Sequence, residues 1–117
     1  DEPKQAVTAR EYLRGCCSAD GPGYVCHIGL VELVWTLARA YGYPREKIAA
    51  AIEQILETAQ LDVESSNDVA AAVKDYRSGT ADFADCLLVR VNSAAGCSRT
   101  VTFDRKAAKL KGFELLK

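Results

Sequence analysis

The chain has 117 residues and a mass of 12.7 kDa, which is the size of one domain with its own hydrophobic core. Hydrophobic residues make up 49% and charged residues 26%, and these proportions argue against a disordered chain. No apolar run approaches the roughly 18 residues of a membrane span. The formal net charge of −1 argues against a strongly basic nucleic-acid binder. We therefore expect a single domain over residues 1–117 and no membrane partner.

Strand and helix patterns alternate along the chain. Helices are predicted over residues 2–14, 29–41, 44–59, 65–79 and 82–96, strands over residues 24–28, 61–64, 99–103 and 113–116, and a helical turn over residues 105–110. The helix over residues 29–41 is apolar nearly all round, which predicts burial on most sides, and the strand over residues 99–103 is also predicted to be buried. Strands separated by helices favour an α/β fold with a parallel sheet and helices on both faces. Ligands of such folds sit beyond the carboxyl ends of the strands.

The five cysteines follow no metal-binding or disulfide pattern. They are Cys16, Cys17, Cys26, Cys86 and Cys97. Their number is odd, no C-x-x-C occurs, and the chain has one histidine, so zinc sites and disulfide frameworks fit badly. Free thiols in a reducing cytoplasm are the interpretation that fits best. The adjacent cysteines 16 and 17 are interpreted as small, buried or half-buried residues, with a redox device as the alternative.

Four carboxylates occupy positions that suggest chemistry. Glu32 lies inside the most hydrophobic helix, where it is either a buried acid that needs a cation or one side of a narrow polar stripe. Asp82 and Asp85 share one face at the start of a helix, a position that the helix dipole alone would explain. Asp104 follows the strand over residues 99–103. If these acids converge, hard oxygen ligands favour Mg²⁺ or Mn²⁺, and the matching chemistry is metal-assisted phosphodiester hydrolysis.

The C-terminal residues are basic. Six Lys and Arg side chains against Asp104 and Glu114 give residues 99–117 a net charge of +4, so residues 1–98 carry −5. A solvated surface is one interpretation, and a patch that faces phosphates is the other.

Four short motifs stand in an order that resembles PIN-domain ribonucleases, and within them the VapC-like toxins of bacterial type II toxin–antitoxin systems. They are VELVWTL (31–37), DFADCL (82–87), AGC (95–97) and TFDR (102–105). This likeness implies a three-layer α/β/α fold with a short parallel sheet. It also implies a cytoplasmic, metal-dependent endoribonuclease that hydrolyses RNA with a water activated by Mg²⁺ or Mn²⁺. The implied partners are RNA, a cognate antitoxin and a second copy in a homodimer.

The resemblance also implies roles for particular residues. Glu32, Asp85 and Asp104 correspond to the catalytic acids, and Asp82 joins them as a supporting metal ligand. Thr102 corresponds to a hydroxyl residue that supports the last acid by hydrogen bonding. Arg99, Arg105, Lys106 and Lys109 are candidates for holding the RNA backbone, and His27 is interpreted as structural rather than as a general base.

The chain departs from the family at its start. PIN domains open with a strand that ends in an Asp-x-Asn motif, and we expect that central strand and its acid to be missing here. A chain without them is predicted to be inactive and poorly folded. Two alternatives stay open: a PIN-like module that binds RNA or protein without cutting, and a regulatory α/β domain of the flavodoxin or receiver type. The second would need an acidic or phosphate-binding loop after a first strand.

Overall fold

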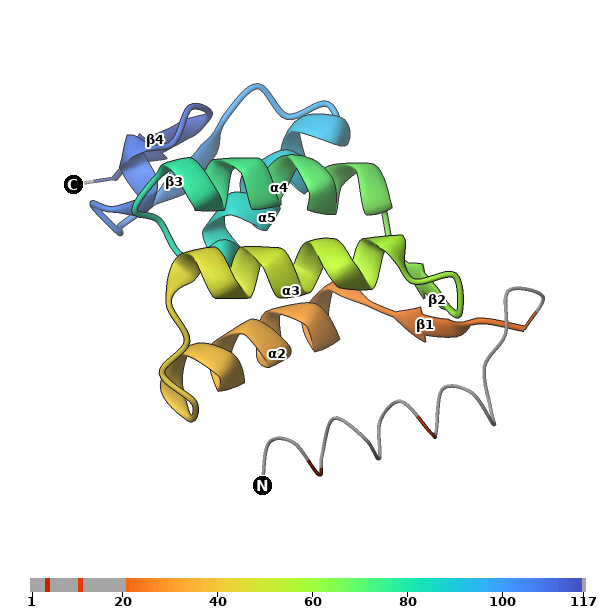
Figure 1. Ribbon diagram of the computed structural model, residues 1–117. Helices are drawn as coiled ribbons and strands as arrows, with labels where there is room; N and C mark the ends of the chain where they lie inside the picture. Colours follow the sequence, from red (N-terminus) through yellow and green to blue (C-terminus); the bar gives the residue numbers. More distant parts are fainter. Residues whose placement is uncertain (1–3, 5–10, 12–20, 117) are drawn as a thin grey trace.

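The structure is a computed structural model that describes Lys4, Glu11 and residues 21–116 (Figure 1). The elements are β1 (Gly23–Val25), α2 (His27–Arg39), α3 (Arg45–Glu57), β2 (Leu61–Val63), α4 (Ser66–Ser78), α5 (Phe83–Ala94), β3 (Thr100–Thr102), the 3₁₀ helix η1 (Ala107–Lys109) and β4 (Phe113–Leu115). The order of strands and helices confirms the predicted α/β class. The helix predicted over residues 2–14 and the Cys16–Cys17 pair lie outside the described residues, apart from Lys4 and Glu11.

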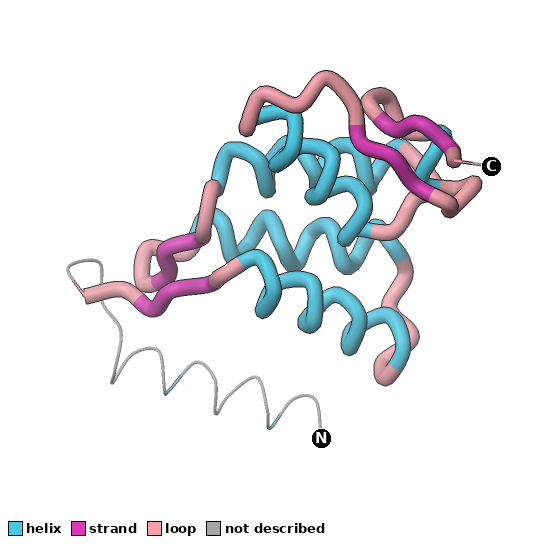
Figure 2. The backbone as a smooth tube through the Cα atoms, turned by 180° about the vertical axis from the view of Figure 1, so that it is seen from behind, coloured by secondary structure: helices cyan, strands magenta, loops and turns pink. Residues whose placement is uncertain are grey.

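All four short strands pair in parallel, as predicted, but in two separate pairs. β1 runs beside β2 with Gly23 opposite Leu61, and β3 runs beside β4 with Thr100 opposite Phe113. Within the described part of the chain, neither pair is hydrogen-bonded to the other. Figure 2 shows the two pairs at opposite ends of the molecule with the helices between them. Because every strand lies in a pair of two, the helices supply most of the core.

The core forms where α4 packs against both α3 and α5 (Figure 1). The largest side chains that are almost fully buried are Leu30, Ile48, Ile52, Val69, Val73, Phe83 and Cys86. Leu30 belongs to α2, and the others recur at helical spacing on the inner faces of α3, α4 and α5, which is how an amphipathic helix buries its apolar stripe. The ring of Tyr76 meets the ring of Phe83 edge to face, with centroids 5.8 Å apart. This contact joins α4 to the first turn of α5.

The helix boundaries differ from the predicted ones for local reasons. The strand over residues 24–28 is predicted too long, because Cys26 is the N-cap of α2 and its Sγ accepts a hydrogen bond from Gly29 N. α2 therefore begins at His27 and ends at Arg39. At the other end of the chain, Gly96 adopts φ +98° just beyond α5, a conformation that suits glycine and stops the helix as predicted.

Two burial predictions are wrong. α2 buries only Leu30 and Val34 and leaves Ile28 and Trp35 largely exposed. The strand over residues 99–103, predicted to be buried, is β3, whose Val101 is 51% exposed. Both errors have one cause, because an apolar side chain is buried only where another element packs against it.

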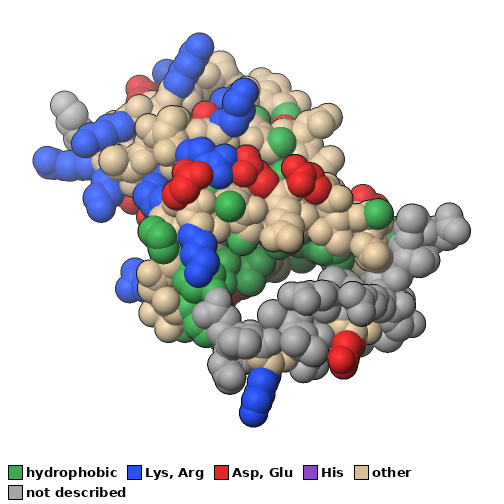
Figure 3. All heavy atoms as spheres, viewed as in Figure 1, with side chains coloured by type: hydrophobic (Ala, Val, Ile, Leu, Met, Phe, Trp, Pro, Cys, Tyr) green, Lys and Arg blue, Asp and Glu red, His purple; other side chains and the backbone are tan. Residues whose placement is uncertain are grey.

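The predicted charge asymmetry is visible on the surface. Figure 3 shows Lys and Arg side chains gathered at the end of the molecule that carries β3, η1 and β4. None of the helices that the structure describes has the length and apolar character needed to cross a membrane. Cys26, Cys86 and Cys97 are free thiols, which confirms that prediction for the described cysteines.

Candidate metal centre

Three aspartates that are separated in the sequence meet at one place. Asp82, Asp85 and Asp104 each offer a carboxylate oxygen, and these oxygens lie within 4.8 Å of one another. Asp82 and Asp104 are exposed and Asp85 is half-buried. The start of α5 and the turn after β3 therefore form an acidic cluster that is open to solvent, which we call the aspartate cluster.

Local structure places each of the three acids. Asp82 is the N-cap residue of α5 but its side chain makes no capping hydrogen bond, and Asp85 lies in the first turn. Asp104 follows β3, and its Oδ1 accepts hydrogen bonds from Lys106 N at 2.8 Å and Ala107 N at 3.4 Å. Thr102 Oγ1 accepts a hydrogen bond from Asp104 N at 3.0 Å. These contacts fix the turn that carries Asp104. The carboxylates of Asp82 and Asp85 make no such hydrogen bond within the described residues.

The aspartate cluster forms no ion pair with any residue that the structure describes. Burial raises the pKa of Asp85, and the negative charges of Asp104 and Asp82 raise it further. Like charges this close repel unless a cation offsets them. The donor set, made of carboxylate oxygens only, suits a hard divalent cation such as Mg²⁺ or Mn²⁺.

This repulsion predicts that the metal-free protein gains stability from Asp85→Asn. A raised pKa means that the folded state holds the Asp85 proton more tightly than the unfolded state, so stability falls as pH rises through that window. In EDTA at pH 7 we expect Asp85→Asn to raise the Tm by about 1–3 °C, since exposed charge interactions are worth less than about 1 kcal/mol. The gain should vanish below the ordinary aspartate pKa of about 3.9. Thermal unfolding across pH measures the difference in Tm between the variant and the wild type. Asp62→Asn, at an exposed position, is the control, and an equal gain in both variants would contradict the prediction.

Glu32 is not part of the aspartate cluster. Its side chain is exposed, so the polar-stripe interpretation holds and the buried-acid interpretation is wrong. Thr36, one turn further along α2, donates its hydroxyl to the carbonyl of Glu32 at 2.9 Å. The described residues that could hold a metal ion together are Asp82, Asp85 and Asp104, without Glu32.

His27 has structural contacts, in line with its predicted role. Its backbone N–H donates to Glu64 Oε1 at 2.8 Å, and its Nε2 lies 2.8 Å from the carbonyl oxygen of Glu64. Because a carbonyl oxygen only accepts, Nε2 carries the proton in this contact. The histidine thus links the start of α2 to the residue that follows β2.

The basic residues predicted to hold RNA lie in different settings. Arg105 and Lys106 are exposed in the turn next to Asp104. Arg99 precedes β3 and forms an ion pair with Glu114, with Nε and Oε2 3.3 Å apart. Lys109 ends η1 and is exposed.

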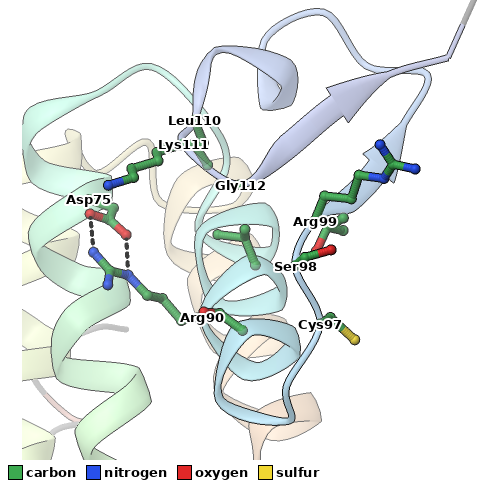
Figure 4. Close-up of a pocket in the computed structure, with 11 residues that line it drawn as sticks. Asp75, Arg90, Cys97, Ser98, Arg99, Leu110, Lys111 and Gly112 are labelled. Carbon is green, nitrogen blue, oxygen red and sulfur yellow. Dashed lines mark hydrogen bonds and ion pairs between the residues drawn. The ribbon is translucent and has the colours of Figure 1, made fainter.

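A cavity of about 390 Å³ lies on another side of α5 (Figure 4). On its wall Asp75 accepts two hydrogen bonds from Arg90, at 2.7 and 2.9 Å, and Arg99 and Lys111 add further positive charge. Figure 4 shows the Arg99 guanidinium turned away from this pair, and the cavity contains none of the three clustered aspartates. This cavity is therefore separate from the aspartate cluster.

The sequence interpretation missed Arg45, the first residue of α3. Its Nη2 donates to the carbonyl oxygens of Tyr76 at 2.5 Å and Ala81 at 2.8 Å, and its guanidinium lies 3.9 Å from the centroid of the Tyr76 ring. One signal could have found it: a cation in the first turn opposes the helix dipole, so it needs a partner elsewhere.

Comparison with known proteins gives one match of note. The chain is 33% identical over 85 residues to a VapC ribonuclease of Aquifex aeolicus (strain VF5). The aligned region covers 73% of this chain and 62% of the relative, so the chain spans less than two thirds of the protein it matches. No protein-family model and no solved structure matches the chain. The similarity supports a VapC-like relationship, in agreement with the motifs.

Proposed function

We propose that the protein is a divalent-metal-dependent endoribonuclease, the toxin of a toxin–antitoxin pair. The observation that carries this proposal is the aspartate cluster, in which three carboxylates meet at an exposed edge and none of them forms an ion pair with a described residue. Similarity to a VapC ribonuclease supports the same chemistry.

Asp82, Asp85 and Asp104 would hold the metal, and the resemblance adds Glu32 as a further proposed ligand. A bound Mg²⁺ or Mn²⁺ would supply Lewis-acid activation of a water and offset negative charge at the scissile phosphate. Asp85 is the most enclosed of the three clustered acids, and its carboxylate gains most from a cation because burial and its neighbours oppose its charge. Asp104 keeps its orientation because the backbone N–H groups of Lys106 and Ala107 and the hydroxyl of Thr102 hydrogen-bond within its turn.

The residues next to Asp104 would receive the RNA. Arg105 and Lys106 are exposed and follow the last clustered acid directly, so their charges lie where the phosphates of a bound strand would pass. Such contacts bind any sequence, because phosphates carry no base information. The proposed specificity is therefore for an RNA backbone rather than for a particular base.

The exposed apolar side chains of α2 support a protein partner. Ile28 is 77% exposed and Trp35 58% exposed, and their spacing of seven residues places both on one face of the helix, as an apolar interaction surface requires. An antitoxin or a second copy of the chain would cover them. We place this partner surface within the proposed toxin function.

The test is RNA cleavage by the full-length protein in Mg²⁺, in Mn²⁺ and in EDTA. We expect endonucleolytic products with either metal and none in EDTA, with activity restored when Mg²⁺ is added back. Cleavage that persists undiminished in EDTA would refute the metal-dependent function. RNA binding without cleavage under every metal condition would instead identify a binding module.

A further inference from the structure

Arg45 touches the segment that leads into the aspartate cluster. One guanidinium nitrogen bridges two carbonyl oxygens, that of Tyr76 near the end of α4 and that of Ala81 just before Asp82. The turn over residues 79–82, which connects α4 to α5, is therefore clamped to the start of α3. Because Asp82 ends this turn and Asp85 lies in the first helical turn after it, the position of the turn influences where both carboxylates point.

The surroundings of Arg45 do not fully compensate its buried positive charge. Its Nε is buried without a hydrogen-bond partner, and the residue forms no ion pair with any described carboxylate. A cation held in this way costs desolvation energy and sits against the dipole of its own helix. The stacking on the Tyr76 ring and the two carbonyl contacts offset part of that cost.

We propose that Arg45 is a positioning residue for the aspartate cluster. By fixing the turn over residues 79–82, it aims Asp82 and Asp85 toward Asp104, so that the three carboxylates are held together before a metal binds. This role rests on the proposed metal-dependent function but concerns the shape of the site rather than the reaction.

Binding of Mn²⁺ to the full-length protein tests this role without RNA. Isothermal titration calorimetry should show about tenfold weaker Mn²⁺ binding for Arg45→Gln, the size expected when the support of metal ligands is lost. Arg45→Lys keeps the charge and the N–H donors but loses the planar guanidinium that stacks on the Tyr76 ring, so it should restore only part of the affinity.

Two control variants separate positioning from general destabilisation. Arg77 also ties α4 to α3, through Glu46 and Glu53, but it does not touch the turn over residues 79–82. Arg77→Gln and the core variant Ile52→Val should therefore keep the Mn²⁺ affinity of the wild type while they lower the Tm. All titrations are run well below the Tm of each variant, with folding checked by circular dichroism, so that Arg45→Lys remains informative if Arg45→Gln folds poorly.

The outcomes are distinct. Loss of Mn²⁺ affinity in the Arg45 variants, with the two controls unchanged, supports the positioning role. Affinities of the Arg45 variants equal to those of the controls would overturn it while leaving the metal site intact. A wild-type protein that binds no Mn²⁺ would overturn the proposed metal site, and the role of Arg45 with it.

Discussion

Replacing Asp85 by asparagine is expected to lower the rate of Mg²⁺-dependent RNA cleavage by at least about 100-fold. The amide keeps the size and the first-turn position of the side chain but removes the negative charge that would hold the metal. A metal ion contributes several kcal/mol of charge stabilisation to such reactions, and about 3 kcal/mol corresponds to roughly 100-fold in rate. The measurement is single-turnover cleavage of a labelled single-stranded RNA by the full-length protein.

Companion variants make this result specific. Asp104→Asn should lose activity to a similar extent, because it too removes the negative charge of a proposed metal ligand. Its turn should stay folded, since the asparagine oxygen can still accept the backbone hydrogen bonds from Lys106 and Ala107. Asp62→Asn changes the same charge on an exposed residue of β2 and should leave the rate unchanged. If Asp85→Asn cleaves as fast as Asp62→Asn, the aspartate cluster is not the active site.

Stability and activity should move in opposite directions in Asp85→Asn. The variant relieves repulsion in the metal-free protein, so it should be slightly more stable while it loses activity. This pairing is typical of a functional site, where charges are kept together at some cost to the fold. A purely structural Asp85, serving the helix dipole, would give a loss of stability instead.

The candidate site could be predicted in part, because its signals are local. Asp82 and Asp85 stand at a helix start and Asp104 at a strand end, and the general rule for parallel α/β folds places such positions near one another. The structure brings these three together. The spacing of apolar residues likewise predicted α3, α4 and α5, whose boundaries depend on nearby turns and caps.

The rest depends on long-range packing, which local patterns do not contain. The burial of α2 and β3 was overestimated, because the exposure of Trp35 and Val101 is decided by which elements reach them. The sequence left Glu32 open between a buried acid and a polar stripe for the same reason, since its exposure follows from the open face of α2. Arg45 escaped notice because its partners lie 31 and 36 residues away, beyond any sequence window.

Phe83→Ala is expected to lower the free energy of unfolding by about 3–5 kcal/mol, the usual cost of removing a buried aromatic ring. Phe83 is 1% exposed and packs edge to face on Tyr76, so its loss would leave a cavity where α4 meets α5. Small domains have a total stability of about 5–15 kcal/mol, which makes this a large fraction. Urea unfolding of the full-length protein, followed by circular dichroism, provides the measurement.

The chain offers a matched control for this substitution in Phe103, which is 78% exposed. Phe103→Ala removes the same atoms from solvent rather than from the core, so its effect should stay within about 0.5 kcal/mol. Equal effects of the two variants would mean that the start of α5 is not held by core packing. The location of Phe83 between Asp82 and Asp85 gives the comparison a functional consequence. Phe83 would anchor the aspartate cluster by packing in the core, and Arg45 would anchor it from another side by hydrogen bonds.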